Sequence, residues 1–326
     1  MRVSVVVPVY NEEGNLPELL SRLSAVMDAT GEPYELVFVD DGSRDRSLPI
    51  LKEAAAARPD RIRVLELARN FGQHQAILAA FESVTGDAVV TLDADLQNPP
   101  EEIPKLLAKM REGHDVVGGI RQNRQDTFLR RLASGIVNRV TVAITRMRIT
   151  DFGCMLRAYS RDVVEEINRC DESSTFIPAL AQSFARKPTE IPVAHAARTR
   201  GQSAYSLYRL VRLNFDLMTG FSLVPLQAFG LFGTLVAAGG IAFALFLFLR
   251  RLIHGAEAEG VFTLFAILFT LVGIAMAGLG LVGEYVGRIY QQVRGRPRFR
   301  VRRVYGLGAR PQPETRDQKP ETPVHS

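Results

Sequence analysis

The sequence predicts an α/β domain with a mostly parallel sheet, followed by two transmembrane helices. Stretches rich in valine and isoleucine alternate with helical patterns over about the first 120 residues. This alternation is typical of a parallel sheet covered by helices on both faces. Further along, residues 226–249 and 261–283 contain no charged side chain. Each of these runs exceeds the roughly 20 residues that cross a bilayer.

Strands are expected at residues 3–9, 35–39, 62–67, 89–92 and 115–118, with helices at 16–27, 75–84 and 101–111 and a short helix after residue 43. A dinucleotide-binding domain shows the same alternation, but it needs a glycine-rich turn directly after the first strand. Here that turn reads Tyr10-Asn11-Glu12-Glu13-Gly14, which is acidic. The sequence therefore argues against NAD binding.

Two aspartates, Asp93 and Asp95, follow the strand at 89–92. Side chains at positions i and i+2 of a strand point to the same side, so the two carboxylates are expected to lie together. Oxygen ligands at the carboxyl edge of a parallel sheet suit a divalent metal, Mg²⁺ or Mn²⁺, that also takes substrate phosphates. A pair of solvated turn aspartates is the alternative interpretation.

The chain carries a net charge of +5, and its arginines are clustered. Residues 121–149 hold seven arginines and one acid, and residues 288–303 hold seven arginines and no acid. Positive charge flanking both ends of a transmembrane hairpin predicts a cytoplasmic location for the first domain. Because these clusters lack interleaved aromatic residues, membrane lipids rather than nucleic acid are the expected partners. The two cysteines fit no metal or disulfide spacing and suggest a reduced compartment.

Several motifs together resemble glycosyltransferase family 2, namely residues 6–12, 40–43 and 93–95. Residues 93–101 and the two C-terminal apolar runs narrow the resemblance to the polyisoprenyl-phosphate glycosyltransferases, over about residues 2–305. Residues 69–74, 121–126, 151–159 and 173–178 resemble a branch whose donor sugar is a formamido-arabinose. Sister enzymes that transfer glucose or mannose to the same kind of lipid remain the alternative.

The resemblance implies a GT-A nucleotide-sugar fold and transfer from a UDP-sugar donor to undecaprenyl phosphate. It also implies a metal-dependent, inverting reaction at the cytoplasmic face of the inner membrane, a homotetramer, and a role in lipid A modification and polymyxin resistance. A processive polysaccharide synthase is disfavoured because its QxxRW motif needs a tryptophan, and this chain has none. A non-catalytic scaffold would be expected to have lost Asp93, Asp95 or Gln97, and all three are present.

The family pattern also implies roles for individual residues. Donor-binding roles fall on Pro8, Tyr10, Glu12, Asp40, Asp41, Asp93, Ala94, Gln97 and Gln122. Asp95 and Gln97 would hold the metal, and Asp95 and Asp151 would be catalytic. The acceptor phosphate would be bound by Arg121, Arg130, Ser134 and Arg198. An aspartate that caps a helix or strand is the plainer interpretation of Asp40, Asp41 and Asp151.

The expected organisation has five parts. These are a GT-A domain at 1–197 with an interfacial helix at 126–146, a juxtamembrane segment at 198–224, a transmembrane hairpin at 225–287, a basic segment at 288–305 and a disordered tail at 306–326. Gly278, Gly280 and the GxxxG pair Gly283 and Gly287 predict close helix packing. The chain departs from the family at Ala204, where a lysine is usual. Either Arg200 compensates for that lysine or the site is weakened.

Overall fold

The structure, a computed structural model, describes residues 1–121, 151, 153–170, 176–195, 223–254, 261–295 and 297–308. It divides into an α/β unit and a helical unit formed mainly by residues 204–296. Gln122, Arg130, Ser134, Arg198, Arg200 and Ala204 lie outside the described residues, as do the expected interfacial helix and most of the tail.

An eight-stranded sheet forms the centre of the α/β unit, in the order β7-β5-β6-β4-β1-β2-β3-β8. Its strands are β1 Val3–Val9, β2 Tyr34–Asp40, β3 Ile62–Leu67, β4 Ala88–Thr91, β5 Val116–Arg121, β6 Arg157–Ser160, β7 Pro188–Val193 and β8 Val301–Tyr305. The neighbours β4-β1-β2-β3 are parallel, as is the pair β5-β7. β6 is antiparallel to both β4 and β5, and β8 is antiparallel to β3. The predicted mostly parallel α/β fold is confirmed.

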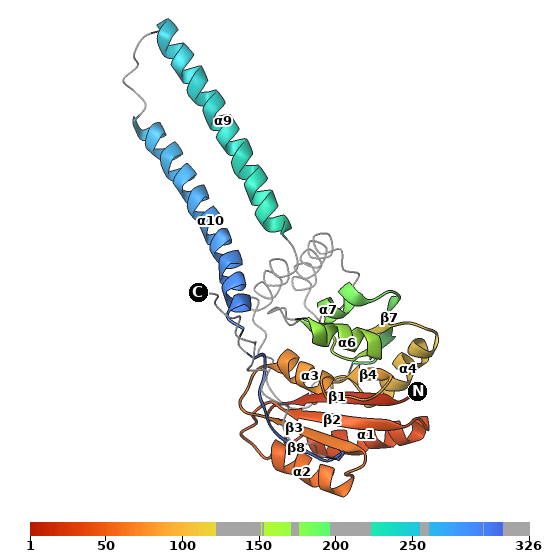
Figure 1. Cartoon of the computed structure of the whole chain (residues 1–326). Helices are drawn as coiled ribbons and strands as arrows, with labels where there is room; N and C mark the ends of the chain where they lie inside the picture. Colours follow the sequence, from red (N-terminus) through yellow and green to blue (C-terminus); the bar gives the residue numbers. More distant parts are fainter. Residues whose placement is uncertain are drawn as a thin grey trace, which may run out of the picture. The chain divides into compact units, whose positions relative to one another are not determined.

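Helices cover both faces of this sheet (Figure 1). They are α1 Leu16–Thr30, α2 Ser47–Ala57, α3 Gln73–Phe81, the 3₁₀ turn η1 Pro100–Glu102, α4 Ile103–Arg111, α6 Arg161–Arg169 and α7 Ile177–Phe184. Leucines of α1, α2 and α4 pack with alternate valines of β1 and β4 into one core. On the other face, Phe81 of α3 packs edge-on against Tyr159 of β6. The central strands are buried on both faces, which explains their continuous apolar sequences.

The strand β8 lies at the edge of the sheet and comes from the far end of the sequence. The sequence predicts a basic segment at residues 288–305, and in the structure Val301–Tyr305 of that segment form a strand paired with β3. The buried carboxylate of Glu66 accepts hydrogen bonds from the Tyr305 hydroxyl at 2.6 Å and from Arg302 at 3.2 Å. Lys52 of α2 lies 3.7 Å from the same carboxylate. These contacts of Glu66 therefore hold β8 against β3 at the edge of the sheet.

The helical unit contains α9 Val224–His254 and α10 Val261–Val293. Both are long and apolar enough to cross a membrane, with mean hydropathies of 1.7 over Val224–Phe243 and 2.0 over Ile267–Val293. A Cβ atom on Gly278 would lie 2.5 Å from the ring of Phe229, so the two helices approach closely there. The prediction of close packing therefore holds at Gly278. At Gly280, Gly283 and Gly287 a Cβ would meet no atom of the described chain within 4 Å.

Glu66→Ala should destabilise the α/β unit, because it leaves the Tyr305 hydroxyl and two cations without their shared acceptor. We expect a loss of about 1–3 kcal/mol in the free energy of unfolding, measured by thermal unfolding of the detergent-solubilised chain. Glu18→Ala is the matched control, since Glu18 is 61% exposed in its ion pair with Arg22 and such pairs contribute about 0–1 kcal/mol. Equal effects of the two substitutions would contradict the assigned role of Glu66.

Candidate functional site

The candidate residues gather at the carboxyl ends of β1, β2, β4 and β5, where open parallel sheets bind ligands. Pro8 lies within β1, and Tyr10, 42% exposed, stands just beyond its end. Asp40 ends β2, and Arg121 ends β5. β4 ends at Thr91, shortly before the paired aspartates. The topology therefore brings most of the described candidates to one edge of the sheet.

The loops that follow β1 and β2 are joined by reciprocal hydrogen bonds. The Asn11 backbone N–H donates to the Ser43 hydroxyl at 3.0 Å, and the Arg44 N–H donates to the Asn11 side-chain oxygen at 2.8 Å. The Glu12 N–H donates to the Ser47 hydroxyl at 2.8 Å. Asn11 adopts a left-handed conformation with φ of 56°, which asparagine tolerates better than most residues. These bonds fix the backbone that carries Tyr10 and Glu12.

Asp40 and Asp41 are both buried, but their carboxylates have different partners. Asp41 accepts backbone N–H groups from Phe71 at 2.7 Å and Gly72 at 2.9 Å. One oxygen of Asp40 accepts the Ser43 N–H at 3.3 Å, while its buried Oδ1 has no hydrogen-bond partner among the residues that the structure describes. Burial raises the pKa of both carboxyl groups. Asp41 thus holds the loop before α3, and Asp40 keeps an oxygen for another donor.

The Asp93-Ala94-Asp95 segment forms a turn beyond the strand. Because β4 ends at Thr91, the strand alternation that we used to place the two carboxylates together does not apply. The turn is shaped instead by Leu96, whose φ of 61° is uncommon for a residue with a side chain. Leu96 is nevertheless buried in the core, and burial holds this conformation in place. The Gln97 N–H then donates to Asp95 Oδ1 at 3.1 Å.

Asp93 is the most perturbed carboxylate of the site. It accepts hydrogen bonds from the Gln73 amide at 2.5 Å and the Asn98 amide at 3.4 Å. Burial, reinforced by the negative charge of Asp95, raises its pKa to about 7. Two carboxylates are therefore crowded in a partly buried turn, with an electrostatic cost that a cation would relieve.

The donor set fits a divalent metal that is shared with a substrate. Within the described part of the chain no cluster of three or more histidine, cysteine or acidic side chains could enclose an ion. Asp93 and Asp95 would supply oxygen atoms beside the expected ligand Gln97, and the remaining ligands would be phosphate oxygens and water. This is how Mg²⁺ is usually held in enzymes that act on phosphate-containing substrates.

Arg121 and Asp151 form a two-pronged ion pair beside this turn. Arg121 Nε donates to Asp151 Oδ2 at 2.7 Å, and its Nη2 donates to Oδ1 at 2.8 Å. The backbone N–H of Gly153 adds a bond to Oδ1 at 3.0 Å. Burial acts to raise the pKa of Asp151, but the bonds and charge of Arg121 outweigh it and hold that pKa below its usual value. A carboxylate so held is a weak base.

Sequence reasoning did not single out Gln73 and Asn98, the two amide donors to Asp93. Both lie inside motifs that carried the family resemblance, residues 69–74 and 93–101, but no local pattern indicates which carboxylate they face. Ala94 is buried between the aspartates and offers only its backbone to a ligand. The hydrogen bond to Asp95 fixes only the backbone of Gln97. The expected role of Gln97 as a metal ligand therefore stays a prediction.

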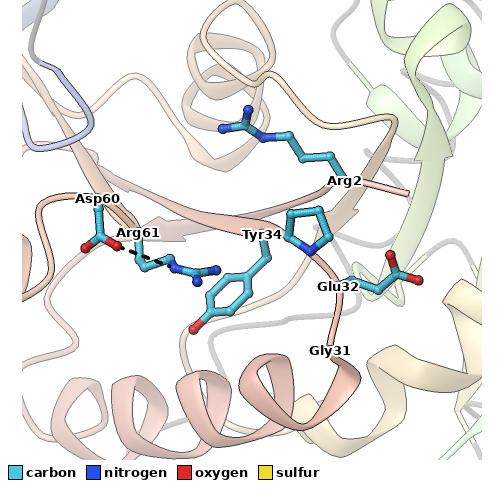
Figure 2. A pocket seen from close by; sticks show the side chains of 7 residues that line it. Arg2, Gly31, Glu32, Tyr34, Asp60 and Arg61 are labelled. Atoms are coloured by element: carbon cyan, nitrogen blue, oxygen red, sulfur yellow. Dashed lines mark ion pairs between the residues drawn. The ribbon is translucent and has the colours of Figure 1, made fainter.

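A cavity of about 500 Å³ lies at the opposite edge of the sheet (Figure 2). It is lined by Arg2, Gly31, Glu32, Pro33, Tyr34, Asp60 and Arg61. The Arg61 guanidinium lies over the Tyr34 ring, 4.7 Å from its centroid, and pairs with Asp60 at 3.6 Å. None of the residues that we predicted to bind donor, acceptor or metal lines this cavity. The cavity therefore lies apart from the candidate site.

Asp93→Asn should stabilise the metal-free chain in a pH-dependent way. The pKa of Asp93 is about 7 in the folded chain against an ordinary value of 3.8, so the folded chain retains a proton that the unfolded chain releases. Stability of the original chain should fall as the pH rises from about 4 to about 7 and then level off. The gain in melting temperature from Asp93→Asn should grow over the same range.

Thermal unfolding in excess chelator near pH 5 and near pH 8.5 measures this gain. Asp60→Asn, at an exposed position on the opposite edge, controls for the loss of any carboxylate. A gain from Asp93→Asn that is the same at both pH values would contradict the raised pKa.

Comparison with known proteins agrees with this geometry. The family model for glycosyl transferase family 2 matches residues 4–168. The chain is 53% identical over 304 residues to the undecaprenyl-phosphate 4-deoxy-4-formamido-L-arabinose transferase of Edwardsiella ictaluri, covering 93% of this chain and 94% of that protein. It is 54% identical over 305 residues to the Shewanella sediminis protein of the same name, covering 93% and 92%.

Among solved structures, the crystal structure of a mycobacterial protein has a TM-score of 0.50 and 18% identity, covering 67% of this chain and 73% of that one. This likeness concerns the fold alone. The assignment to a protein family rests on the family-model match and on the identity to the two transferases. The chain belongs to glycosyl transferase family 2 and is a glycosyltransferase with a GT-A fold.

Proposed function

We propose that this enzyme transfers 4-deoxy-4-formamido-L-arabinose from its UDP-sugar to undecaprenyl phosphate, with inversion at the anomeric carbon. The observation that carries the proposal is the pair Asp93 and Asp95 beside the Arg121–Asp151 ion pair, in a chain more than half identical to transferases of that name. The paired aspartates suit a metal-bound diphosphate. The adjacent guanidinium of Arg121 suits the phosphate of the acceptor.

The donor is assigned to the loops after β1, β2 and β4. Asp40 or Asp41 accepts the imide N–H of uracil; Asp40 offers an unpartnered buried oxygen, and Asp41 already accepts two backbone donors. Pro8, Tyr10 and Glu12 form the neighbouring wall on a backbone fixed by hydrogen bonds. Asp93 and Asp95, with Gln97, would hold a divalent metal that binds the diphosphate. The metal, when bound, neutralises charge that develops on the departing UDP.

The acceptor needs orientation more than deprotonation. A phosphate monoester has a second pKa near 6, so at neutral pH it is largely a dianion. One of its oxygens attacks the anomeric carbon while the bond from that carbon to the UDP oxygen breaks, and UDP leaves with the bonding electrons. We assign the acceptor phosphate to Arg121, with Arg130, Ser134 and Arg198 as further ligands. Asp151, already paired with Arg121, orients that guanidinium and balances its charge.

The lipid acceptor places the reaction at a membrane surface. We assign α9 and α10 to the bilayer on their length and hydropathy, and we assign the α/β unit to the cytoplasmic side on the flanking arginine clusters. In this arrangement the product is a lipid-linked formamido sugar, which suits lipid A modification and resistance to cationic peptides. We also propose that the enzyme is a homotetramer, as the family resemblance implies.

Transfer should require a divalent metal and both aspartates of the turn. Asp95→Ala and Asp93→Ala should each lower the transfer rate by about 10²-fold or more, the usual cost of removing a key electrostatic stabiliser. The measurement is transfer of labelled sugar to undecaprenyl phosphate by the full chain in detergent. Chelator should abolish transfer, and added Mg²⁺ or Mn²⁺ should restore it. Asp60→Ala at the opposite edge should leave the rate unchanged. Undiminished transfer in chelator would exclude the metal.

The donor sugar should be selected by its formamido group. That group offers one N–H and one C=O, so polar groups that pair with both are left unsatisfied by an analogue that lacks them. We expect UDP-linked formamido-arabinose to be used at least about 10²-fold better, in kcat/KM, than UDP-glucose. Parallel assays with these two donors and GDP-mannose test this. Equal use of UDP-glucose or GDP-mannose would favour the sister glucosyl- or mannosyltransferase.

A further inference from the structure

A second arginine, Arg157, contacts the backbone of Asp151 rather than its carboxylate. Arg157 on β6 is only 2% exposed, opposite Thr91 of β4 and Gly118 of β5 in the strand register. Burying a guanidinium is costly unless its N–H groups find acceptors. The partners that Arg157 has inside the sheet therefore indicate what this buried charge does.

Its hydrogen bonds go to the backbone of the segment that carries Asp151. Arg157 Nη2 donates to the carbonyl of Asp151 at 2.5 Å, and its Nε donates to the carbonyl of Cys154 at 2.9 Å. The Thr91 hydroxyl donates to the Met155 carbonyl at 2.6 Å. The segment is thus fastened from both β4 and β6, and Arg157 makes the bond at Asp151 itself.

Two glycines leave room for the guanidinium groups on either side of Asp151. A Cβ on Gly118 would lie 2.8 Å from Arg157 Nη1, and a Cβ on Gly153 would lie 2.6 Å from Arg121 Nη2. Any larger residue at either position would displace an arginine. Asp151 is therefore held at its carboxylate by Arg121 and at its carbonyl by Arg157.

We propose that Arg157 is a positioning residue for the transfer reaction: it fixes the backbone of Asp151 so that the carboxylate keeps both of its bonds to Arg121. Arg157 is buried away from solvent and acts on substrate only through this pair. A shift of about 1 Å in a group that orients a substrate can lower a rate by about 10²-fold. The proposal rests on the function proposed above, in which the Arg121–Asp151 pair serves the acceptor phosphate.

A double-mutant cycle tests the coupling. Arg157→Lys keeps the charge but loses the forked pair of donors. We expect it to lower kcat/KM for undecaprenyl phosphate by about ten- to a hundredfold, with the KM for the UDP-sugar unchanged. In an Asp151→Ala background, the same Arg157→Lys change should cost less than about threefold, because the group it positions is gone. The same fold-loss in both backgrounds would overturn the proposal.

Gly118→Ala tests the coupling between Arg157 and Asp151 in a second way. It removes no charge but crowds the Arg157 guanidinium, so it should show the same loss and the same dependence on Asp151. Arg63→Lys is the matched control: Arg63 is a partly buried arginine that donates to the Ser83 carbonyl, at a distance from the site. Its transfer rate per folded molecule should equal that of the original chain.

The possible failures are distinguishable. Full transfer by Asp151→Ala alone would remove the role proposed for Asp151 and leave nothing for Arg157 to position. A damaging Asp151→Ala combined with additive Arg157→Lys and Gly118→Ala would overturn the positioning role only. If Arg157→Lys and Gly118→Ala both unfold in a melting experiment while Arg63→Lys does not, Arg157 is a structural residue of the sheet and the proposal is wrong.

Discussion

The burial of two neighbouring carboxylates in one turn is the constraint on which the site depends. Burial, reinforced by the negative charge of Asp95, raises the pKa of Asp93 to about 7, so ionising both carboxylates carries a cost in the empty site. A purely structural turn would gain nothing from this arrangement. An enzyme whose donor brings a metal-bound diphosphate relieves the strain only when the donor is present. The carboxylates thus make the empty site less stable, and under the proposed function a metal-bound donor would offset that cost.

The surrounding structure keeps the turn from relaxing. Leu96, buried in the core, sets a left-handed backbone, while Gln73 and Asn98 hold the carboxylate of Asp93 from two sides. On the neighbouring strands, Arg121 and Arg157 hold Asp151 at its two ends. Arg121 and Arg157 are both held by hydrogen bonds, so their charges are placed in advance of the substrates. Such preorganisation is the main means by which enzymes stabilise charge in a transition state.

The sequence allowed the strands and helices up to residue 121 and the position of the paired aspartates to be predicted, because apolar periodicity and the ends of strands are local properties; it did not lead us to β6, β7, α6 or α7. It did not allow us to place Arg121 against Asp151, since that ion pair joins residues thirty positions apart. Nor could it distinguish Asp40 from Asp41, because their partners at Ser43, Phe71 and Gly72 depend on how the loops fold. Strand alternation gave a wrong reason for the proximity of Asp93 and Asp95, because β4 ends at Thr91.

The strand β8 was the largest surprise, and its cause is again non-local. Residues 301–305 contain two adjacent arginines and show no strand alternation, and beside a transmembrane run they suggest only a basic flank. Their pairing with β3 requires Glu66, more than two hundred residues earlier, to meet Arg302 and Tyr305. In chain order α9 and α10 are therefore an insertion between β7 and β8 of one sheet. The α/β unit cannot complete its sheet until the apolar hairpin has been made. The buried carboxylate of Glu66 consequently links folding of the catalytic unit to synthesis of the whole chain.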